Sequence, residues 1–353
     1  MRSLLHQWAT GAAATASERQ QMAELMLADT ERAAVFGITP DTVDESLDRR
    51  LHLFQTLCPQ FAPFCIQRLG WTEAIAAERL ETFWNLWLPL AIQLADERAA
   101  MGRPLIQGIL GGQGTGKTTL TVLLTWILAA LGYRVCGISI DDLYKTYSER
   151  QQLQQFDPRL RWRGPPGTHD VTLGLSVLKQ LRAAEPGQPI AIPRFDKSLW
   201  NGAGDRTMPE QVSNIDIVLF EGWFVGARPV DPSVFDHAPE PIITKRDRQF
   251  ARDINEALRD YLPLWEQLDR LMVLAPVDYR LSQEWRRQAE QQMKASGKTG
   301  MSDAEIDEFV IYFWRSLHPD LFIAPLCQQP GYADFVIEID ASHAPSRLYC
   351  PGR

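Results

Sequence analysis

The chain has 353 residues and a formal net charge of −8, with 45% hydrophobic and 23% charged residues, values typical of a soluble globular protein. The acidic balance argues against a nucleic-acid partner, because nonspecific binding to nucleic acid depends on Lys and Arg contacts with phosphates. Five scattered cysteines without a C-x-x-C pair, and apolar runs shorter than the roughly 18 residues of a membrane span, predict a cytoplasmic protein without a membrane partner.

The first part of the chain, residues 1–103, is expected to form a helical extension. Apolar residues recur at helical spacing in "RRLHLFQTLCPQF" and "ETFWNLWLPLAIQLADERAAM", and no strand pattern interrupts them. From Pro104 the pattern changes to short apolar runs that alternate with helical stretches. The sequence therefore predicts two units, an extension over 1–103 and an α/β domain over 104–353.

The short apolar runs of the second unit indicate strands buried on both faces. They occupy residues 105–110, 134–140, 189–195, 215–220, 270–275 and 334–340. Strands that alternate with helices favour a three-layer α/β/α domain around a mainly parallel sheet. Ligands of such sheets bind beyond the carboxyl ends of the strands, so chemistry is expected directly after these runs.

A glycine-rich stretch, "GGQGTGKTTL", directly follows the first apolar run. It matches the complete G-x-x-x-x-G-K-T phosphate-loop pattern between an expected strand and an expected helix. Backbone amides at a helix N-terminus can bind the phosphates of a nucleoside triphosphate, with Lys117 reaching the β- and γ-phosphates and Thr118 holding Mg²⁺. The expected nucleotide-binding residues are Gly111, Gly112, Gln113, Gly114, Thr115, Gly116, Lys117, Thr118 and Thr119.

A second "GKT" at 297–299 serves as a control for this pattern. A phosphate loop there would need glycine at position 292, which is Gln292. The stretch is therefore interpreted as a loop, and Ser302 with Glu305 is expected to cap the helix that follows it.

Acidic residues follow two of the other expected strands. Glu221 comes directly after "IDIVLF" and is, together with Thr118, a candidate to hold the metal ion. Asp141 and Asp142 follow "GISI", where a carboxylate could accept the proton of an attacking hydroxyl and aim its oxygen in line. An ordinary helix cap followed by a first-turn acid would give the same pair.

Two other classes of nucleotide-dependent protein compete with a kinase. "TKRD" at 244–247 fits the pattern that reads guanine in nucleotide-dependent switch proteins, but the D-x-x-G expected after the acid strand is replaced by "FEGW". We interpret 244–247 as the start of a charged helix. An ATP-driven assembly factor without a small substrate would have an exposed apolar partner surface, which the sequence alone does not test.

Two polar loops, "RWRGPPGTHD" and "PRFDKSLWNGAGDR", separate the later elements. Their cations could concentrate positive charge near the acceptor despite the acidic chain. That arrangement suits an anionic acceptor such as a carboxylate, which Arg side chains bind with two parallel hydrogen bonds. The candidate substrate-binding residues are Lys145, Arg163, His169, Asp170, Arg194, Asp196, Lys197 and Arg206.

Taken together, these motifs with "SIDDLY", "FEGWFVGARP" and "EWRRQAEQQMKASGKTGMSDAEIDEFV" make the chain resemble the D-glycerate 3-kinases of the plant and cyanobacterial type over about 105–340. Those enzymes belong to the P-loop kinase group that includes uridine kinase, phosphoribulokinase and pantothenate kinase. The resemblance implies transfer of phosphate from ATP, with Mg²⁺, to the 3-hydroxyl of D-glycerate, as in photorespiratory carbon recovery. Another small-molecule kinase of the same group is the alternative.

The resemblance also implies roles for individual residues. Asp141 falls where the relatives have their base, with Asp142 an additional acid, and Lys117 is the third candidate catalytic residue. Arg286 and Arg287 match a lid segment, about 280–310, that closes over ATP and excludes water. No role follows for residues 1–103 or for the oligomeric state.

Overall fold

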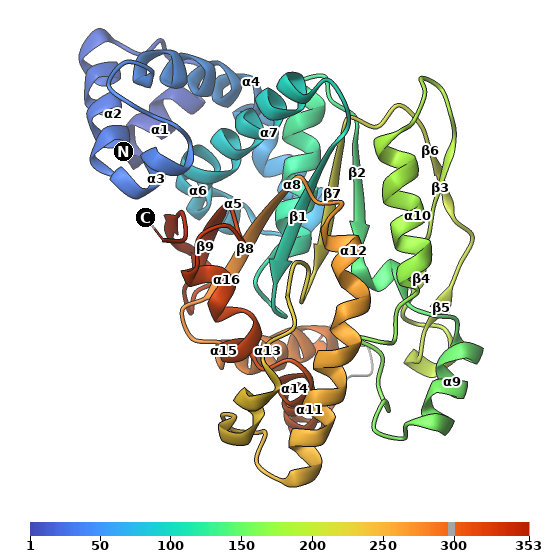
Figure 1. The fold of residues 1–353 in the computed structure, drawn as a ribbon. Coiled ribbons are helices and arrows are strands. Elements are labelled where there is room, and N and C mark those ends of the chain that lie inside the picture. Colours follow the sequence, from blue (N-terminus) through green and yellow to red (C-terminus); the bar gives the residue numbers. More distant parts are fainter. Residues whose placement is uncertain (296–300, 353) are drawn as a thin grey trace.

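The computed structural model describes residues 1–295 and 301–352, and its centre is a six-stranded sheet (Figure 1). The strand order is β10-β9-β8-β1-β7-β2, in which only β10 runs antiparallel to its neighbour. The strands are β1 Leu105–Gly111, β2 Val135–Ser139, β7 Ile217–Gly222, β8 Arg270–Pro276, β9 Phe335–Ile339 and β10 Pro345–Tyr349. The expected mainly parallel sheet is confirmed.

The expected strand at 189–195 does not belong to the central sheet, so its assignment to that sheet was wrong. The run 189–195 yields β3 Ile190–Ile192, which pairs antiparallel with β6 Glu210–Val212 in a separate hairpin. Its middle residue Ala191 is exposed between two buried isoleucines, a pattern typical of a strand that is buried on one face only. A second small hairpin follows, formed by β4 Phe195–Asp196 and β5 Asp205–Arg206.

Alternate side chains of the sheet enter two hydrophobic cores, one on each face. Leu105 and Ile109 of β1 belong to one core, whereas Ile106 and Leu110 belong to the other. Helix α8 covers the first face, and α10 and α11 contribute to the second core. These helices and the short α12 span Lys117–Ala130, Val171–Arg182, Lys245–Ala257 and Leu262–Trp265. The three-layer α/β/α architecture is thereby confirmed.

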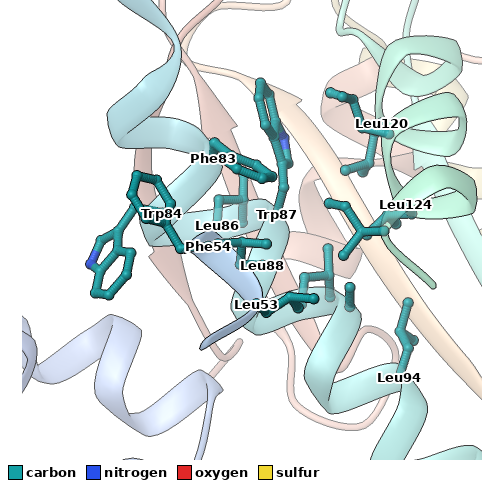
Figure 2. Close-up of a cluster of buried hydrophobic side chains, with 14 of the residues drawn as sticks. Leu53, Phe54, Phe83, Trp84, Leu86, Trp87, Leu88, Leu94, Leu120 and Leu124 are labelled. Atoms are coloured by element: carbon teal, nitrogen blue, oxygen red, sulfur yellow. The ribbon is translucent and has the colours of Figure 1, made fainter. Parts of the chain in front are cut away.

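The N-terminal region is helical, as expected, and packs on the same face as α8 (Figure 1). Figure 2 shows Phe83, Leu86 and Trp87 of this region beside Leu120 and Leu124 of α8. The extension therefore shares one continuous core with the α/β domain. Its helices are α1 Arg2–Ala9, α2 Ala16–Ala28, α3 Thr30–Val35, α4 Val43–Leu69, α5 Glu73–Glu78, α6 Leu80–Thr82, a π-helical turn Phe83–Trp87 and α7 Leu88–Met101.

The remaining helices gather near the carboxyl ends of the parallel strands or beside them (Figure 1). They are α9 Tyr147–Phe156, α13 Leu281–Ala295, α14 Asp303–Ser316, α15 Pro319–Phe322 and α16 Ala324–Gln328, with 3₁₀ helices Ile140–Leu143, Trp200–Gly202, Pro232–His237 and Leu258–Tyr261. Within the described residues, no helix combines the length and hydropathy needed to span a membrane.

Two predictions about helix starts are confirmed. Ser302 and Glu305 form a capping box before α14, because each side chain accepts the backbone N–H of the other residue. Thr244 and Asp247 do the same before α11, so "TKRD" is a helix start. The second "GKT", 297–299, lies outside the described residues.

Candidate active site

The glycine-rich stretch forms a tight loop between the end of β1 and the start of α8. Gly114 and Gly116 have φ values of +79° and +86°, a left-handed conformation that favours glycine. The Thr115 hydroxyl and the Lys117 ammonium both donate hydrogen bonds to the carbonyl oxygen of Gly112, at 2.9 and 2.8 Å. The lysine is therefore folded onto its own loop, where an incoming phosphate could take over its hydrogen bond.

Glu221 lies beside the phosphate loop because its strand lies between β1 and β2. In the sheet register it is level with Ile109 of β1 and Ser139 of β2. Thr118 donates its hydroxyl hydrogen to Glu221 Oε1 at 3.3 Å, whereas Glu221 Oε2 is buried without a partner in the part of the chain that the structure describes. Burial raises the pKa of Glu221, and the nearby Lys117 ammonium opposes that rise.

The two neighbouring aspartates after β2 have different surroundings. Asp142 accepts hydrogen bonds from the backbone amides of Ser139 and Phe195, at 3.0 and 3.3 Å, and from Arg194 at 3.0 Å. Asp141 instead lies 2.6 Å from the ammonium of Lys197. Asp142 thus holds the β2 turn and the strand after Arg194 together, while the ion-pair partner of Asp141 comes from an exposed loop.

Asp141 is electrostatically coupled to the phosphate loop. Burial alone would raise its pKa, but the Lys197 ammonium and the Tyr144 hydroxyl bring the pKa of Asp141 below its ordinary value. Burial lowers the pKa of Lys117, an effect that the negative charges of Glu221 and Asp141 oppose. The structure therefore brings together the lysine and two carboxylates that the sequence placed after three different strands.

His169 lies behind Asp141 in a buried aromatic environment. Its ring stacks on Tyr144 with 4.5 Å between the ring centroids, and its Nδ1 is 2.8 Å from the hydroxyl of Tyr261. Burial lowers the pKa of His169 to about 3, so the imidazole is neutral at physiological pH. Its Nε2 is buried and has no hydrogen-bond partner among the residues described.

Three of the expected acceptor-binding cations are already engaged within the protein. Arg194 binds Glu210 at 2.7 Å as well as Asp142. Arg206 binds Asp170 at 3.0 Å and the carbonyl oxygen of Tyr144 at 2.8 Å. Lys197 is bound to Asp141, as described above. These cations connect the two polar loops to each other and to the end of β2.

Two other cations have donors left over. Within the described residues, Arg163 donates hydrogen bonds through Nη1 alone, to the carbonyl oxygens of Gly202 and Ala203 at 2.6 and 3.0 Å. No ion pair or side-chain hydrogen bond of Lys145 is recorded within residues 1–295 and 301–352, and its positive charge opposes protonation of His169.

The expected acidic members of the acceptor set serve local structure. Asp170 accepts the backbone N–H of Leu173 at 2.9 Å and caps α10. Asp196 accepts both the amide and the hydroxyl hydrogen of Ser198 within its own turn. Both carboxylates are therefore already bound within the protein.

Arg286 and Arg287, the two arginines expected to close over ATP, are both paired with carboxylates. Arg286 binds Glu290 of its own helix, and Arg287 binds Asp307 of α14 at 2.5 Å. Their neighbour Trp285 packs against the loop, since a Cβ atom placed on Gly114 would come within 2.6 Å of the Trp285 Cβ. An apolar cavity between the loop and these helices is lined by residues that include Gln113, Trp223 and Phe313.

Four residues at the site were not found from the sequence. The Tyr144 side chain is hydrogen-bonded to Asp141. Arg150 donates hydrogen bonds to the carbonyl oxygens of Ala203 and Gly204, and these bonds hold the loop that follows Lys197. Trp285 covers Gly114, and His343 Nδ1 donates to the Gly114 carbonyl oxygen at 2.9 Å. Tyr144 and Trp285 lie inside stretches quoted for the resemblance, but no role was assigned to them, whereas the contacts of Arg150 and His343 join segments that are distant in the sequence.

Comparison with known proteins returned no matching family model. The chain is 30% identical to the chloroplastic D-glycerate 3-kinase of Arabidopsis thaliana over 331 residues, 88% of this chain and 69% of that protein. It is 34% identical to an uncharacterized kinase of Schizosaccharomyces pombe over 220 residues, 60% of this chain and 79% of that one. A solved structure of D-glycerate 3-kinase from Cryptococcus neoformans superposes with a TM-score of 0.68 at 27% identity, covering 75% of this chain and 99% of the other.

Proposed function

The chain belongs to the D-glycerate 3-kinase family and is therefore a kinase, and we propose that it transfers the γ-phosphoryl group of ATP to the 3-hydroxyl of D-glycerate. One structural observation carries the proposal. Glu221 lies at the end of β7, whereas Lys117 follows β1 and Asp141 follows β2, and the three side chains meet near the carboxyl ends of these neighbouring strands. That set supplies a phosphate-binding cation, a metal-side carboxylate and a base.

We assign the proton transfer to Asp141. Its low pKa keeps the carboxylate ionised at neutral pH, so it can accept a hydrogen bond from the acceptor hydroxyl and aim the oxygen at the γ-phosphorus. Lys117 would leave the Gly112 carbonyl oxygen and neutralise charge on the transferring phosphoryl group. The amides of residues 111–119 would bind the phosphates.

The residues at the end of β7 fit a magnesium ion. Mg²⁺ is commonly held by one or two carboxylate or hydroxyl ligands, with waters and substrate phosphates completing its octahedral shell. Glu221 has a buried oxygen that no described residue contacts by a hydrogen bond, and Thr118 presents its hydroxyl to the same carboxylate. We propose that these two residues would hold Mg²⁺, which would supply positive charge to stabilise the negative charge of the phosphates.

For the acceptor we propose Lys145 and Arg163 as the cations that bind the glycerate carboxylate. Both retain donors that the described part of the protein does not use, whereas Arg194 and Arg206 would have to break ion pairs to bind a substrate. His169 Nε2, which has no hydrogen-bond partner among the described residues, is suited to the 2-hydroxyl of glycerate. Asp170, Asp196, Arg194 and Arg206 position the loops, and Lys197 positions Asp141.

Arg286 and Arg287 are proposed to contact ATP after the lid closes. Their present partners are the buried Glu290 and the partly exposed Asp307, and phosphate oxygens can accept the same paired hydrogen bonds from Arg as a carboxylate. A cytoplasmic location, expected from the scattered cysteines, stays a prediction, and the Arabidopsis relative is named as chloroplastic.

The proposal is tested by coupled measurement of ADP release over a panel of acceptors. The panel contains D-glycerate, L-glycerate, uridine, pantothenate, ribulose 5-phosphate and a blank, each with ATP and Mg²⁺. We expect release that depends on D-glycerate. Release with pantothenate or uridine and none with D-glycerate would refute the acceptor, and acceptor-independent release would refute transfer to a small molecule.

A further inference from the structure

The helical extension contains a buried arginine without an acidic partner. Arg50 of α4 is 3% exposed, its Nε is buried without a hydrogen-bond partner, and no ion pair is recorded for it within the described residues. Other arginines of the extension differ. Arg49, the preceding residue, binds Asp96 at 2.6 Å, and Arg32 binds Asp29 at 2.7 Å.

Two neighbours of Arg50 contribute a hydrogen-bond donor and a positive charge. Its guanidinium lies 5.6 Å from the ring centroid of Trp84, whose indole Nε1 is also buried without a partner in the described part of the chain. Figure 2 shows this indole nitrogen on the side of Trp84 that faces away from the labelled hydrophobic cluster. Arg32 is close enough to repel the Arg50 charge.

This arrangement is energetically incomplete without an anion. Burial and the Arg32 charge lower the pKa of Arg50 to about 9, so the guanidinium is still protonated at neutral pH. A buried charge is normally paired, because desolvation costs far more than a cation–π contact returns. The missing component is therefore a compact hydrogen-bond acceptor that carries negative charge.

We propose that Arg50 and Trp84 form a binding site for a small inorganic anion of the phosphate type. A tetrahedral oxyanion can accept two parallel hydrogen bonds from a guanidinium and a further one from an indole N–H. The site belongs to the extension and uses no residue of the phosphate loop. Trp84 shares a core with Leu120 and Leu124 of α8, so the anion would stabilise the layer that supports that helix.

Thermal unfolding of the full chain with saturating ADP and Mg²⁺ tests this site, because the nucleotide fills the phosphate loop. Sodium phosphate is titrated at constant ionic strength against a sodium HEPES background. We expect a saturable rise in Tm of about 2 °C at tenfold excess over Kd. Arg50→Met should abolish the rise, and in phosphate-free buffer this variant should be at least as stable as the wild type.

Two further variants keep the test decisive if Arg50→Met does not fold. Arg50→Lys retains the charge but loses the bidentate geometry, so its apparent Kd for phosphate should rise about tenfold. Arg49→Met, on the same helix, removes a cation that already has a carboxylate and should leave the phosphate response unchanged. A wild-type chain without a saturable response, or an Arg50→Lys response equal to that of the wild type, would overturn the proposal.

Discussion

The charged side chains on the two sides of the phosphate loop differ in how completely they are paired. Toward β7 and β2, Glu221 keeps a buried oxygen without a partner among the described residues, and Asp141 is bound to a lysine on an exposed loop. Toward α13 and α14, Arg286 and Arg287 are both bound to carboxylates. Paired charges hold elements together, whereas buried polar atoms without partners indicate where a ligand is expected to bind.

The largest effect is expected at Lys117, the cation shared by the loop and the site. Lys117→Ala should reduce kcat by about 10³-fold, because a charge aimed at the transferring phosphoryl group is lost where water is excluded. The fold should survive, since the ammonium bonds one loop carbonyl. Lys179→Ala, which removes an exposed lysine from α10, serves as the control. A correctly folded Lys117→Ala with near-normal kcat would reduce the glycine loop to a structural turn.

A sharper contrast separates the two neighbouring aspartates. Asp141→Asn should lower kcat by about 10²-fold or more with little change in ATP affinity, because the amide cannot accept the proton. Asp142→Asn should act mainly on folding, with a loss of about 1–3 kcal/mol in the free energy of unfolding. The Asp142 carboxylate accepts three hydrogen bonds, and the amide of Asn has one acceptor oxygen in place of two.

These aspartate variants are compared by kcat at saturating ATP and D-glycerate and by chemical denaturation. If Asp142→Asn is the inactive, stable enzyme and Asp141→Asn the active one, the base has been assigned one residue too early. If both variants are active, no carboxylate after β2 takes part in the reaction.

Lys197 offers a test through pH. Its ammonium lowers the pKa of Asp141, so the carboxylate that we propose as the base is ionised at pH values above that lowered pKa. In Lys197→Met, burial of Asp141 is no longer opposed by the ammonium, so the pKa of Asp141 should rise. The acid limb of the kcat profile should therefore move to higher pH. At pH 8 the rate should stay within about threefold of the wild type, since Asp141 is ionised there in both proteins. An unmoved acid limb would show that Lys197 does not act through Asp141.

The smallest effect is expected at Arg287 of α13, which is paired with Asp307. Asp307→Asn frees Arg287 from an exposed ion pair and should change the free energy of unfolding by less than about 1 kcal/mol. Arg287→Met should in addition raise KM for ATP by about tenfold, because a phosphate ligand is lost. Equal KM values for the two variants would mean that Arg287 serves only the lid structure.

The features that could be predicted from the sequence are those fixed by local pattern. Continuous apolar runs identified five strands of the sheet, and a contiguous motif identified the loop between β1 and α8. The run 189–195 was assigned wrongly because three apolar residues in a hairpin resemble a fully buried strand. Strand β10 was not predicted, since only Leu348 of its five residues is buried.

Contacts between distant segments explain the rest. The sequence could not tell which of Asp141 and Asp142 faces Lys197, because that choice depends on the turn Ile140–Leu143 and on a loop more than fifty residues later. It also could not show that Arg194 forms ion pairs with Asp142 and Glu210. Fewer cations are therefore available to bind an acceptor than a count of positive residues suggests.

The central claim is tested most directly by the identity of the phosphorylated product. The wild-type enzyme is incubated with ATP, Mg²⁺ and D-glycerate, and the product is analysed by ³¹P and ¹³C NMR. We predict 3-phosphoglycerate as the product, with no product from Lys117→Ala under the same conditions. Phosphate on the 2-hydroxyl, or release of inorganic phosphate with unmodified glycerate, would contradict the account.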